Sequence, residues 1–116
     1  MNRYVMVVLS NPTSGAEDAY NEWYNSEHVV DVTAVAGFRS GQRFRLATTG
    51  IGNAEPPTHR YLALYEVDAE SAESANAALV EAAREGRIRG HESIDLASVA
   101  TWFFEPISER HVSNSR

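Results

Sequence analysis

The residues best suited to chemistry lie in one short segment, 20–31, with the sequence YNEWYNSEHVVD. His28 and Asp31 are three residues apart, so on a helix their side chains lie on one face. A carboxylate beside a histidine can fix its tautomer and stabilise its protonated form, which is the usual support for a general base. We therefore expect His28 to act as a general base that Asp31 orients. The alternative is structural, with His28 near a helix start and paired to Asp31 or Glu27.

A second set of candidates lies on the strand predicted at 38–46. Arg39, Arg43 and Arg45 alternate with uncharged residues, which gives this strand one basic face. An arginine that points into a pocket can hold a substrate carboxylate or an enolate oxygen with two parallel hydrogen bonds. Arg43 is the candidate for this catalytic role. The alternative is a solvated strand face that the acidic surface neutralises.

Large aromatic side chains occupy positions predicted to face inward from the sheet and the helix. They are candidates for the lining of a substrate cavity, or else for ordinary core and dimer interface: Tyr20, Trp23, Tyr24, Tyr61, Tyr65, Trp102 and Phe104. Buried Tyr and Trp tips need polar partners, which favours a ligand pocket. His59, at the base of a long loop, enters the site if that loop closes and is otherwise exposed. His91 and His111 are expected at the surface.

The composition narrows the chemistry further. The 116 residues include no cysteine, and all ten basic residues are arginine. A thiolate nucleophile, a Cys-based metal site and a lysine Schiff base are therefore excluded. His28 and Asp31 are only two ligands, so we expect no metal, and we expect no tightly bound cofactor.

Charge and hydropathy limit the partners and the compartment. The net charge of −6 argues against a nucleic-acid partner. No apolar run reaches the ~18 residues of a membrane span, and the N-terminus lacks the pattern of a signal peptide. We therefore expect a cytoplasmic protein that acts on a small molecule.

Hydrophobic periodicity predicts the elements that must position these residues. β-branched or alternating runs predict four strands: 4–9, 38–46, 60–67 and 99–105. Apolar residues at helical spacing predict three helical pieces: 16–24, 27–36 and 68–84. The first two are separated by a break or a new cap at Asn25–Ser26. Thr13 or Ser14 is expected to cap the first piece, Ser14 in a capping box with Glu17. Gly37 is expected to end the helical piece at 27–36, and Gly86 the piece at 68–84. Residues 48–59 form a long loop, either a lid or a mobile connection.

The element order β-α-β-β-α-β predicts a ferredoxin-like α+β fold with a four-stranded antiparallel sheet. Helices cover one face of such a sheet, yet three of the strands are apolar on both faces. The uncovered face needs a partner, and a second copy of the sheet is the simplest one. We therefore expect a homodimer, with one domain over residues 1–106 and a polar tail over 107–116.

Two runs in segment 20–45 resemble the EthD-like branch of the dimeric α+β barrel superfamily. They are Tyr-Asn-x-Trp-Tyr-x-x-Glu-His-Val-x-Asp-Val and Val-x-Gly-Phe-x-Ser-Gly-Gln-Arg-Phe. The likeness extends over about the first 85 residues, and the last quarter fits by topology alone. The chain has Val30 and Ala36 where related proteins often have proline, which bears on helix geometry more than on chemistry.

The resemblance implies a barrel of two ferredoxin-like subunits, each with a cavity between its sheet and its helices. It also implies that His28, with Asp31 beside it, is the polar pair of that cavity. The superfamily includes aromatic polyketide cyclases, muconolactone isomerases, cofactor-free monooxygenases and haem-degrading enzymes, so the fold does not choose the reaction.

Together these observations favour an enzyme of aromatic, polyketide or catabolic metabolism that uses acid–base chemistry: a cyclase, an isomerase or a lyase. In each case the expected partner is a small, aromatic molecule. One alternative is a cofactor-free monooxygenase that acts on a phenolic substrate. The others are a protein that binds haem through His28 or His59, and a dimer that binds a metabolite without turning it over.

Overall fold

Four β-strands form one antiparallel sheet in the order β2-β3-β1-β4 in the computed structural model, which describes residues 1–53 and 55–114. The strands are β1 (Asn2–Ser10), β2 (Phe38–Arg45), β3 (Tyr61–Ala69) and β4 (Ala100–Phe104). Every second residue of β3 is buried, from Tyr61 to Ala69, as a strand covered on one face requires. The expected ferredoxin-like fold with four strands is confirmed.

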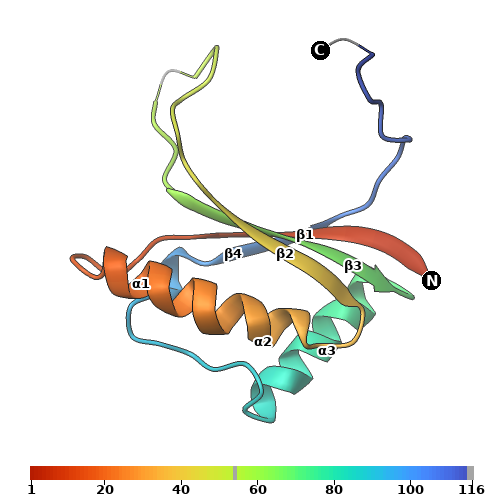
Figure 1. The fold of residues 1–116 in the computed structure, drawn as a ribbon, viewed down its shortest axis with the longest axis horizontal. Helices are drawn as coiled ribbons and strands as arrows, with labels where there is room; N and C mark the ends of the chain where they lie inside the picture. The colour runs from red at the N-terminus through yellow and green to blue at the C-terminus, as the bar shows by residue number, and fades with distance from the viewer. Residues whose placement is uncertain (54, 115–116) are drawn as a thin grey trace.

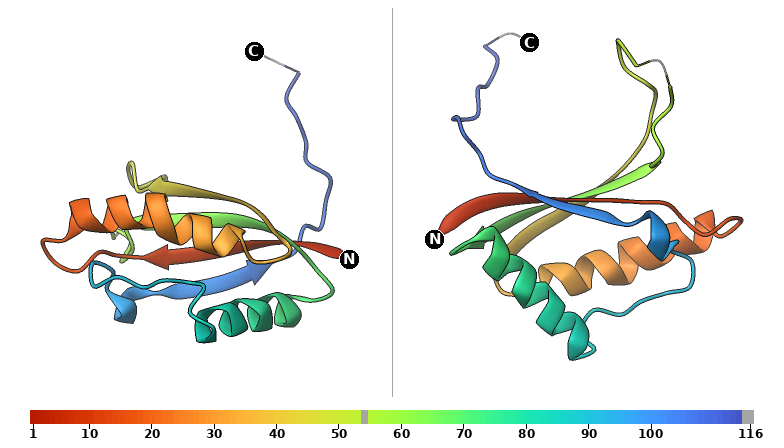
Figure 2. Two further views of the ribbon diagram at one scale, coloured as in Figure 1. Left: turned by 60° about the horizontal axis from the view of Figure 1, so that its bottom comes forward. Right: turned by 180° about the vertical axis from the view of Figure 1, so that it is seen from behind.

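Two helical segments cover one face of this sheet (Figures 1 and 2). The first consists of α1 (Glu17–Trp23), the π-helical turn η1 (Tyr24–His28) and α2 (Val29–Thr33). The second is α3 (Ala72–Arg84), and a short 3₁₀ turn, η2 (Leu96–Ser98), precedes β4. The core lies between helices and sheet and is rich in tyrosine, with Tyr20, Tyr24 and Tyr65 almost fully buried.

The first helical segment differs from its prediction in two ways. The expected break at Asn25–Ser26 is wrong, because a π turn continues the helix there, with the Val29 amide donating to the Tyr24 carbonyl five residues back. The expected side-chain cap is also wrong, since the helix begins after Ala16 and no side chain caps it.

The ends of the other helices agree better with the sequence. Gly37 and Gly86 have φ angles of +94° and +78° after α2 and α3, as predicted for glycines that end a helix. α3 begins at Ala72 instead of 68, because β3 continues to Ala69 and Ser71 caps the helix. The Ser71 and Ser74 side chains form a capping box there.

A β-bulge in β2 changes which residues face the helices. The sequence predicts Phe38 on the same face as Phe44, and this is wrong. Pairing with β3 shifts between Phe38 and Ser40, so Phe38 lies opposite Val67 and is buried. Beyond the bulge the expected alternation holds, and Arg43 lies on the helix-covered face.

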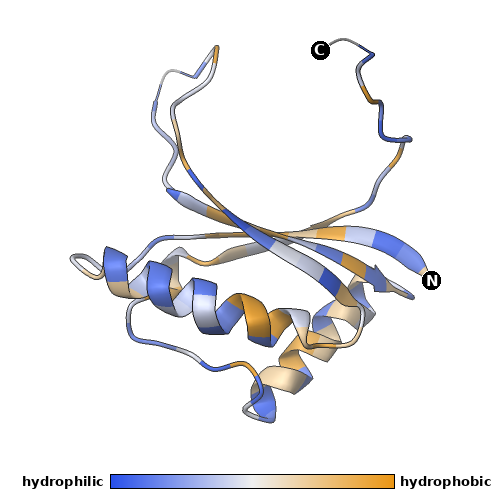
Figure 3. Cartoon of the chain, in the orientation of Figure 1, coloured by the Kyte–Doolittle hydropathy of each residue, from blue (hydrophilic) through white to orange (hydrophobic). Residues whose placement is uncertain are grey.

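No helix of the described residues covers the opposite face of the sheet (Figure 1), which is charged near Arg3, Glu66 and Asp68 and apolar over the rest. Trp102 and Phe104 are 58% and 57% exposed there at the β4 edge, and Phe44 and Leu46 are exposed at the opposite edge, on β2 and just after it. Figure 3 shows apolar stretches along the strands as well as along α2. The loop after β2 and the chain after β4 both extend away on this side (Figure 1). Residues 54 and 115–116 of the expected loop and tail lie outside the described residues.

None of the helices formed by residues 1–53 and 55–114 is long and apolar enough to cross a membrane.

Candidate functional site

His28 is the last residue of the π-helical turn and lines a cavity between the helices and the sheet. The cavity has a volume of about 200 Å³, and its lining is mostly apolar: Met6, Val8, His28, Val32, Tyr65, Asn76, Leu79, Val99 and Thr101. Met6, Val32 and Tyr65 are buried. Asn76 and Thr101 are exposed, so the cavity opens between α3 and β4. This arrangement of a few polar groups in an apolar cavity is typical of small-molecule sites.

Two polar groups of this cavity have unused hydrogen-bonding capacity. The Nδ1 atom of His28 and the hydroxyl of Tyr65 are buried, and neither has a partner with hydrogen-bond geometry among the described residues, although the Tyr24 and Tyr65 hydroxyls are close enough to shift each other's pKa. Leaving a buried polar group unsatisfied costs about 1–3 kcal/mol. Such groups in a native structure therefore point to a bound water or ligand.

The protonation states of these two groups suit acid–base chemistry. Burial lowers the pKa of His28, while the carboxylate of Asp31 and the backbone of Arg89 act in the opposite direction. The imidazole is therefore neutral at pH 7 and can accept a proton. Burial also raises the pKa of Tyr65, so its hydroxyl stays protonated and can donate a hydrogen bond.

Asp31 lies near His28 but makes its hydrogen bonds elsewhere. Its carboxylate accepts from the backbone nitrogen, Nε and Nη2 of Arg89, at 3.0, 3.0 and 2.9 Å. Arg89 also forms an ion pair with Glu27 at 2.9 Å, which fastens the connection after α3 to the first helix. These contacts hold the pKa of the Asp31 carboxyl below its usual value. Asp31 therefore favours a protonated His28 through space, with no hydrogen bond between them in the described structure.

The expected aromatic residues lie in several places, and Trp102 and Phe104, which were expected to face inward, are on the uncovered face of the sheet. Trp23 and Tyr24 pack directly on the His28 ring, with centroids 4.9 and 4.8 Å away. Of the expected aromatic residues, Tyr65 lines the cavity itself. Tyr20 belongs to the core, where its hydroxyl hydrogen-bonds to the Ser10 hydroxyl at 2.6 Å.

Arg43 and Tyr61 line a second, polar cleft that shares no lining residue with the His28 cavity. This cleft has a volume of about 290 Å³, and its lining comes mostly from η1, α1 and β2: Asn21, Asn25, Arg43, Phe44, Arg45 and Tyr61. The Tyr61 hydroxyl donates to Glu17 and accepts from Asn21. Arg43 therefore lines a different cleft from His28, although both side chains pack on the Tyr24 ring and the charge of Arg43 also lowers the pKa of His28.

Two further expected site residues lie away from His28. Trp102 was expected on the helix-covered face, but its pairing with Val7 turns it to the uncovered face. The His59 Nε2 atom hydrogen-bonds to the Ser98 carbonyl at 2.7 Å. His59 lines a hollow of about 390 Å³ at the base of the long loop, bordered by Leu9 and Phe44.

Sequence reasoning missed three residues that shape the site. Arg89 anchors Asp31, while Asn76 and Thr101 line the open side of the cavity. Asn76 interrupts the alanine-rich face of α3, which is the signal that would have marked it. Arg89 lies in a connection without periodicity, where no local pattern indicates which helix it contacts.

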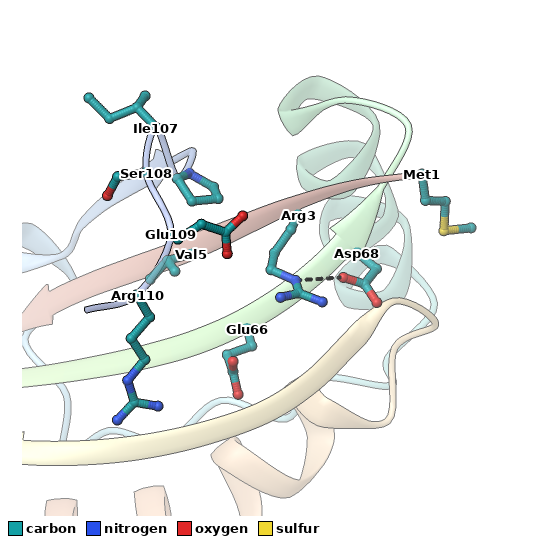
Figure 4. Close-up of a pocket in the computed structure, with 10 residues that line it drawn as sticks. Met1, Arg3, Val5, Glu66, Asp68, Ile107, Ser108, Glu109 and Arg110 are labelled. Carbon is teal, nitrogen blue, oxygen red and sulfur yellow. Dashed lines mark ion pairs between the residues drawn. The ribbon is translucent and has the colours of Figure 1, made fainter. Parts of the chain in front are cut away.

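A larger hollow than the His28 cavity lies between the chain after β4 and the sheet (Figure 4). It is wide open, about 1050 Å³, and is bordered by charged side chains that include the Arg3–Asp68 ion pair. It contains no histidine, so we do not treat it as the reactive site. In residues 1–53 and 55–114, no group of three or more His, Asp or Glu could hold a metal ion.

Comparison with solved structures relates this architecture to known proteins. An EthD-like protein from Ralstonia eutropha has a TM-score of 0.59 and 23% identity, over 95% of this chain and 97% of that one. An EthD-family protein from Bacillus halodurans has a TM-score of 0.56 and 16% identity, over 92% and 100%. A protein from Arabidopsis thaliana has a TM-score of 0.63 and 14% identity, over 93% and 99%.

No protein-family model matches the sequence, and no curated protein sequence does. At these identities the structural likeness concerns the fold, and it agrees with the resemblance that segment 20–45 shows. The chain therefore has the ferredoxin-like fold of the EthD-family proteins.

Proposed function

We propose that this chain is a small-molecule enzyme in which His28 acts as a general base and Tyr65 as a hydrogen-bond donor. The observation that carries the proposal is that both side chains line one apolar cavity, each with a buried polar atom that lacks a partner among the described residues. An acceptor and a donor without partners in one mostly apolar cavity match a substrate that loses a proton and gains negative charge on oxygen.

The chemistry that follows is enolisation. His28 removes a proton from a carbon next to a carbonyl, and the electron pair moves onto the carbonyl oxygen. The Tyr65 hydroxyl donates a hydrogen bond to that oxygen, and the Asp31 carboxylate stabilises the imidazolium that forms. Return of the proton to another carbon gives isomerisation, loss of a leaving group gives a lyase reaction, and attack of the enolate on a second carbonyl gives cyclisation.

The size of the cavity limits the substrate. Ligand pockets are commonly about 300–1,000 Å³, whereas this cavity is about 200 Å³. An apolar protein cavity of about 150 Å³ can hold benzene. We therefore propose a substrate with a single ring and few substituents.

Solvent deuterium exchange tests the proposal without knowledge of the natural substrate. A panel of single-ring ketones and lactones is incubated in D₂O with the protein, and exchange next to the carbonyl is followed by NMR. We expect faster exchange with the wild-type protein and a loss of about 10²–10⁴-fold in that acceleration for His28→Gln. The matched control is His111→Gln, at an exposed histidine. Equal exchange with both variants refutes the role of His28.

The alternatives give different results in the same panel. Oxygen consumed in proportion to product indicates a monooxygenase. Thermal stabilisation by a ligand, with neither exchange nor turnover, indicates a binding protein.

We also propose that two copies pair through the uncovered face of the sheet. Exposed apolar side chains on this face come from both edge strands, Trp102 and Phe104 from β4 and Phe44 from β2. A contiguous apolar face of this kind is unusual on a monomer and marks an interaction surface. An antiparallel sheet that presents the same face from each copy suits a two-fold dimer.

A further inference from the structure

The polar cleft at the edge of the sheet holds positive charge that no carboxylate of the described residues pairs with. Six of the arginines form ion pairs with carboxylates: Arg3, Arg39, Arg60, Arg84, Arg87 and Arg89. Arg43 and Arg45, which line the cleft, form none within the described residues. Arg45 is near enough to Glu17 to lower its carboxyl pKa, yet the two do not make an ion pair. The chain has 16 acidic residues and a net charge of −6, so two unpaired arginines in one cleft need an explanation.

Aromatic rings hold the Arg43 guanidinium in place without neutralising its charge. Its Cζ atom lies 4.2 Å from the centre of the Tyr24 ring and 5.1 and 5.4 Å from those of Tyr20 and Tyr61. Ring faces attract a cation but carry no net charge. The guanidinium is therefore fixed in orientation and retains its charge.

Most of the hydrogen-bond donors of Arg43 also have no partner among the described residues. Its Nη1 donates to the Asn25 Oδ1 at 2.8 Å, and its Nη2 is buried with no partner in the described part of the chain. An arginine has five N–H donors, and this contact uses one of them. The Asn25 amide nitrogen, beside it on the exposed side of the cleft, adds a neutral donor.

We propose that this cleft binds the carboxylate group of a small organic acid. A planar guanidinium with an adjacent amide N–H matches the two oxygens of a carboxylate, and Arg45 adds a second positive charge. Glu17 lies nearby and repels a dianion more strongly than a monoanion, so the cleft favours a carboxylate over phosphate. The inference does not depend on the His28 reaction, because the two cavities share no lining residue.

NMR of the ¹⁵N-labelled full-length chain provides the test, with the arginine Nε–H signals followed as sodium benzoate is added at constant ionic strength. We expect a saturable shift of the Arg43 signal, assigned by its loss in Arg43→Gln. Sodium phosphate is expected to bind at least tenfold more weakly. Saturation by phosphate at the same concentration as benzoate, or by sodium chloride alone, overturns the carboxylate assignment.

Asn25→Asp is the decisive variant, because it keeps the shape of the side chain and the acceptor for Arg43. The new carboxylate pairs with the guanidinium and competes with the ligand. Since Asn25 is exposed, the variant should fold even if Arg43→Gln does not. We expect at least tenfold weaker benzoate binding in Asn25→Asp, and unchanged binding in His28→Gln and in the exposed control Arg84→Gln. Benzoate binding to Asn25→Asp as tight as to the wild-type protein refutes the proposal.

Discussion

The replacement of Gly41 by alanine tests whether the position of Tyr65 matters to the site. Gly41 lies opposite Tyr65 in the pairing of β2 with β3. A Cβ atom at Gly41 would lie 2.8 and 2.9 Å from two carbons of the Tyr65 ring and 3.1 Å from a methyl carbon of Val29. Ordinary contact begins near 3.4 Å, so the ring would have to retreat by about 0.6 Å. The ring is fully buried, and the space open to its hydroxyl end is the His28 cavity.

The expected cost follows from this overlap. Inserting one methyl group into a packed core typically destabilises a protein by about 1–3 kcal/mol. At roughly 4 °C per kcal/mol for a domain of this size, the melting temperature should fall by about 4–12 °C. The displaced ring should also reduce the cavity and move the proposed hydrogen-bond donor. Differential scanning calorimetry measures the first effect, and the deuterium-exchange panel measures the second.

Two comparisons identify the cause of the effect. Gly90→Ala is the matched control, because a Cβ there meets nothing within 4 Å and its φ is not in the left-handed region. The second comparison is a double-mutant cycle. Tyr65→Leu removes the ring, so Gly41→Ala should cost at least about 1 kcal/mol less in that background. Tyr65→Phe keeps the ring carbons and should give no relief. The packing argument fails if Gly41→Ala has the same melting temperature as the wild-type protein. It also fails if Gly41→Ala costs the same free energy of unfolding in the wild-type and Tyr65→Leu backgrounds.

Four further predictions concern the cavity and the uncovered sheet face. Tyr65→Phe removes a buried hydroxyl that lacks a partner, so the variant should be at least as stable as the wild type in thermal melts. Its acceleration of deuterium exchange should fall by about 10²–10³-fold. A clear loss of stability would mean that the hydroxyl has a hydrogen-bond partner in the folded protein. Burial lowers the pKa of His28 and the reactive form is neutral, so kcat/KM should fall with decreasing pH through a pKa below about 6.5. Arg89→Gln removes the cation that neutralises the Asp31 carboxylate, so the pKa of His28 should rise and the acidic limb of the kcat/KM profile should move to higher pH. An acidic limb at the same pH as in the wild type contradicts the electrostatic role of Asp31. Trp102→Glu should convert the dimer to a monomer, as measured by size-exclusion chromatography with light scattering. The control Val80→Glu, on α3, should leave the dimer intact. A wild-type protein with the mass of one chain refutes the dimer.

The sequence was sufficient to predict the structure where one face of a strand or helix is polar, or where a single residue type determines the backbone geometry. The alternation in β3 gave a single assignment, and its buried positions include Tyr61 and Tyr65 as predicted. The glycines that end α2 and α3 could also be predicted, because a left-handed φ strongly favours glycine.

Prediction failed where several assignments satisfy the same local pattern. Residues 102–104 are all aromatic, so alternation alone does not decide which of them face the helices. The pairing of Val7 with Trp102 decides it and places Phe103 inward. The bulge between Phe38 and Ser40 has no mark in the sequence and reverses the orientation of Phe38, while Arg39 forms an ion pair with Asp68, away from Arg43. Both errors have the same physical origin, since the register between strands depends on contacts distant in sequence.

The π-helical turn links these local features to the candidate site. It inserts one residue into the helical repeat, and each residue of an α-helix turns the chain by about 100°. Uninterrupted α-helical spacing from Tyr20 and Tyr24 would turn Asp31 toward the sheet. With the insertion, Val32 takes the buried position instead, and Asp31 turns outward to the connection after α3, where Arg89 binds it. His28, at the end of the turn, lines the cavity without a charged partner in contact with it. The turn therefore accounts for two properties of the site together, a neutral, half-buried histidine and a carboxylate that acts on it only through space.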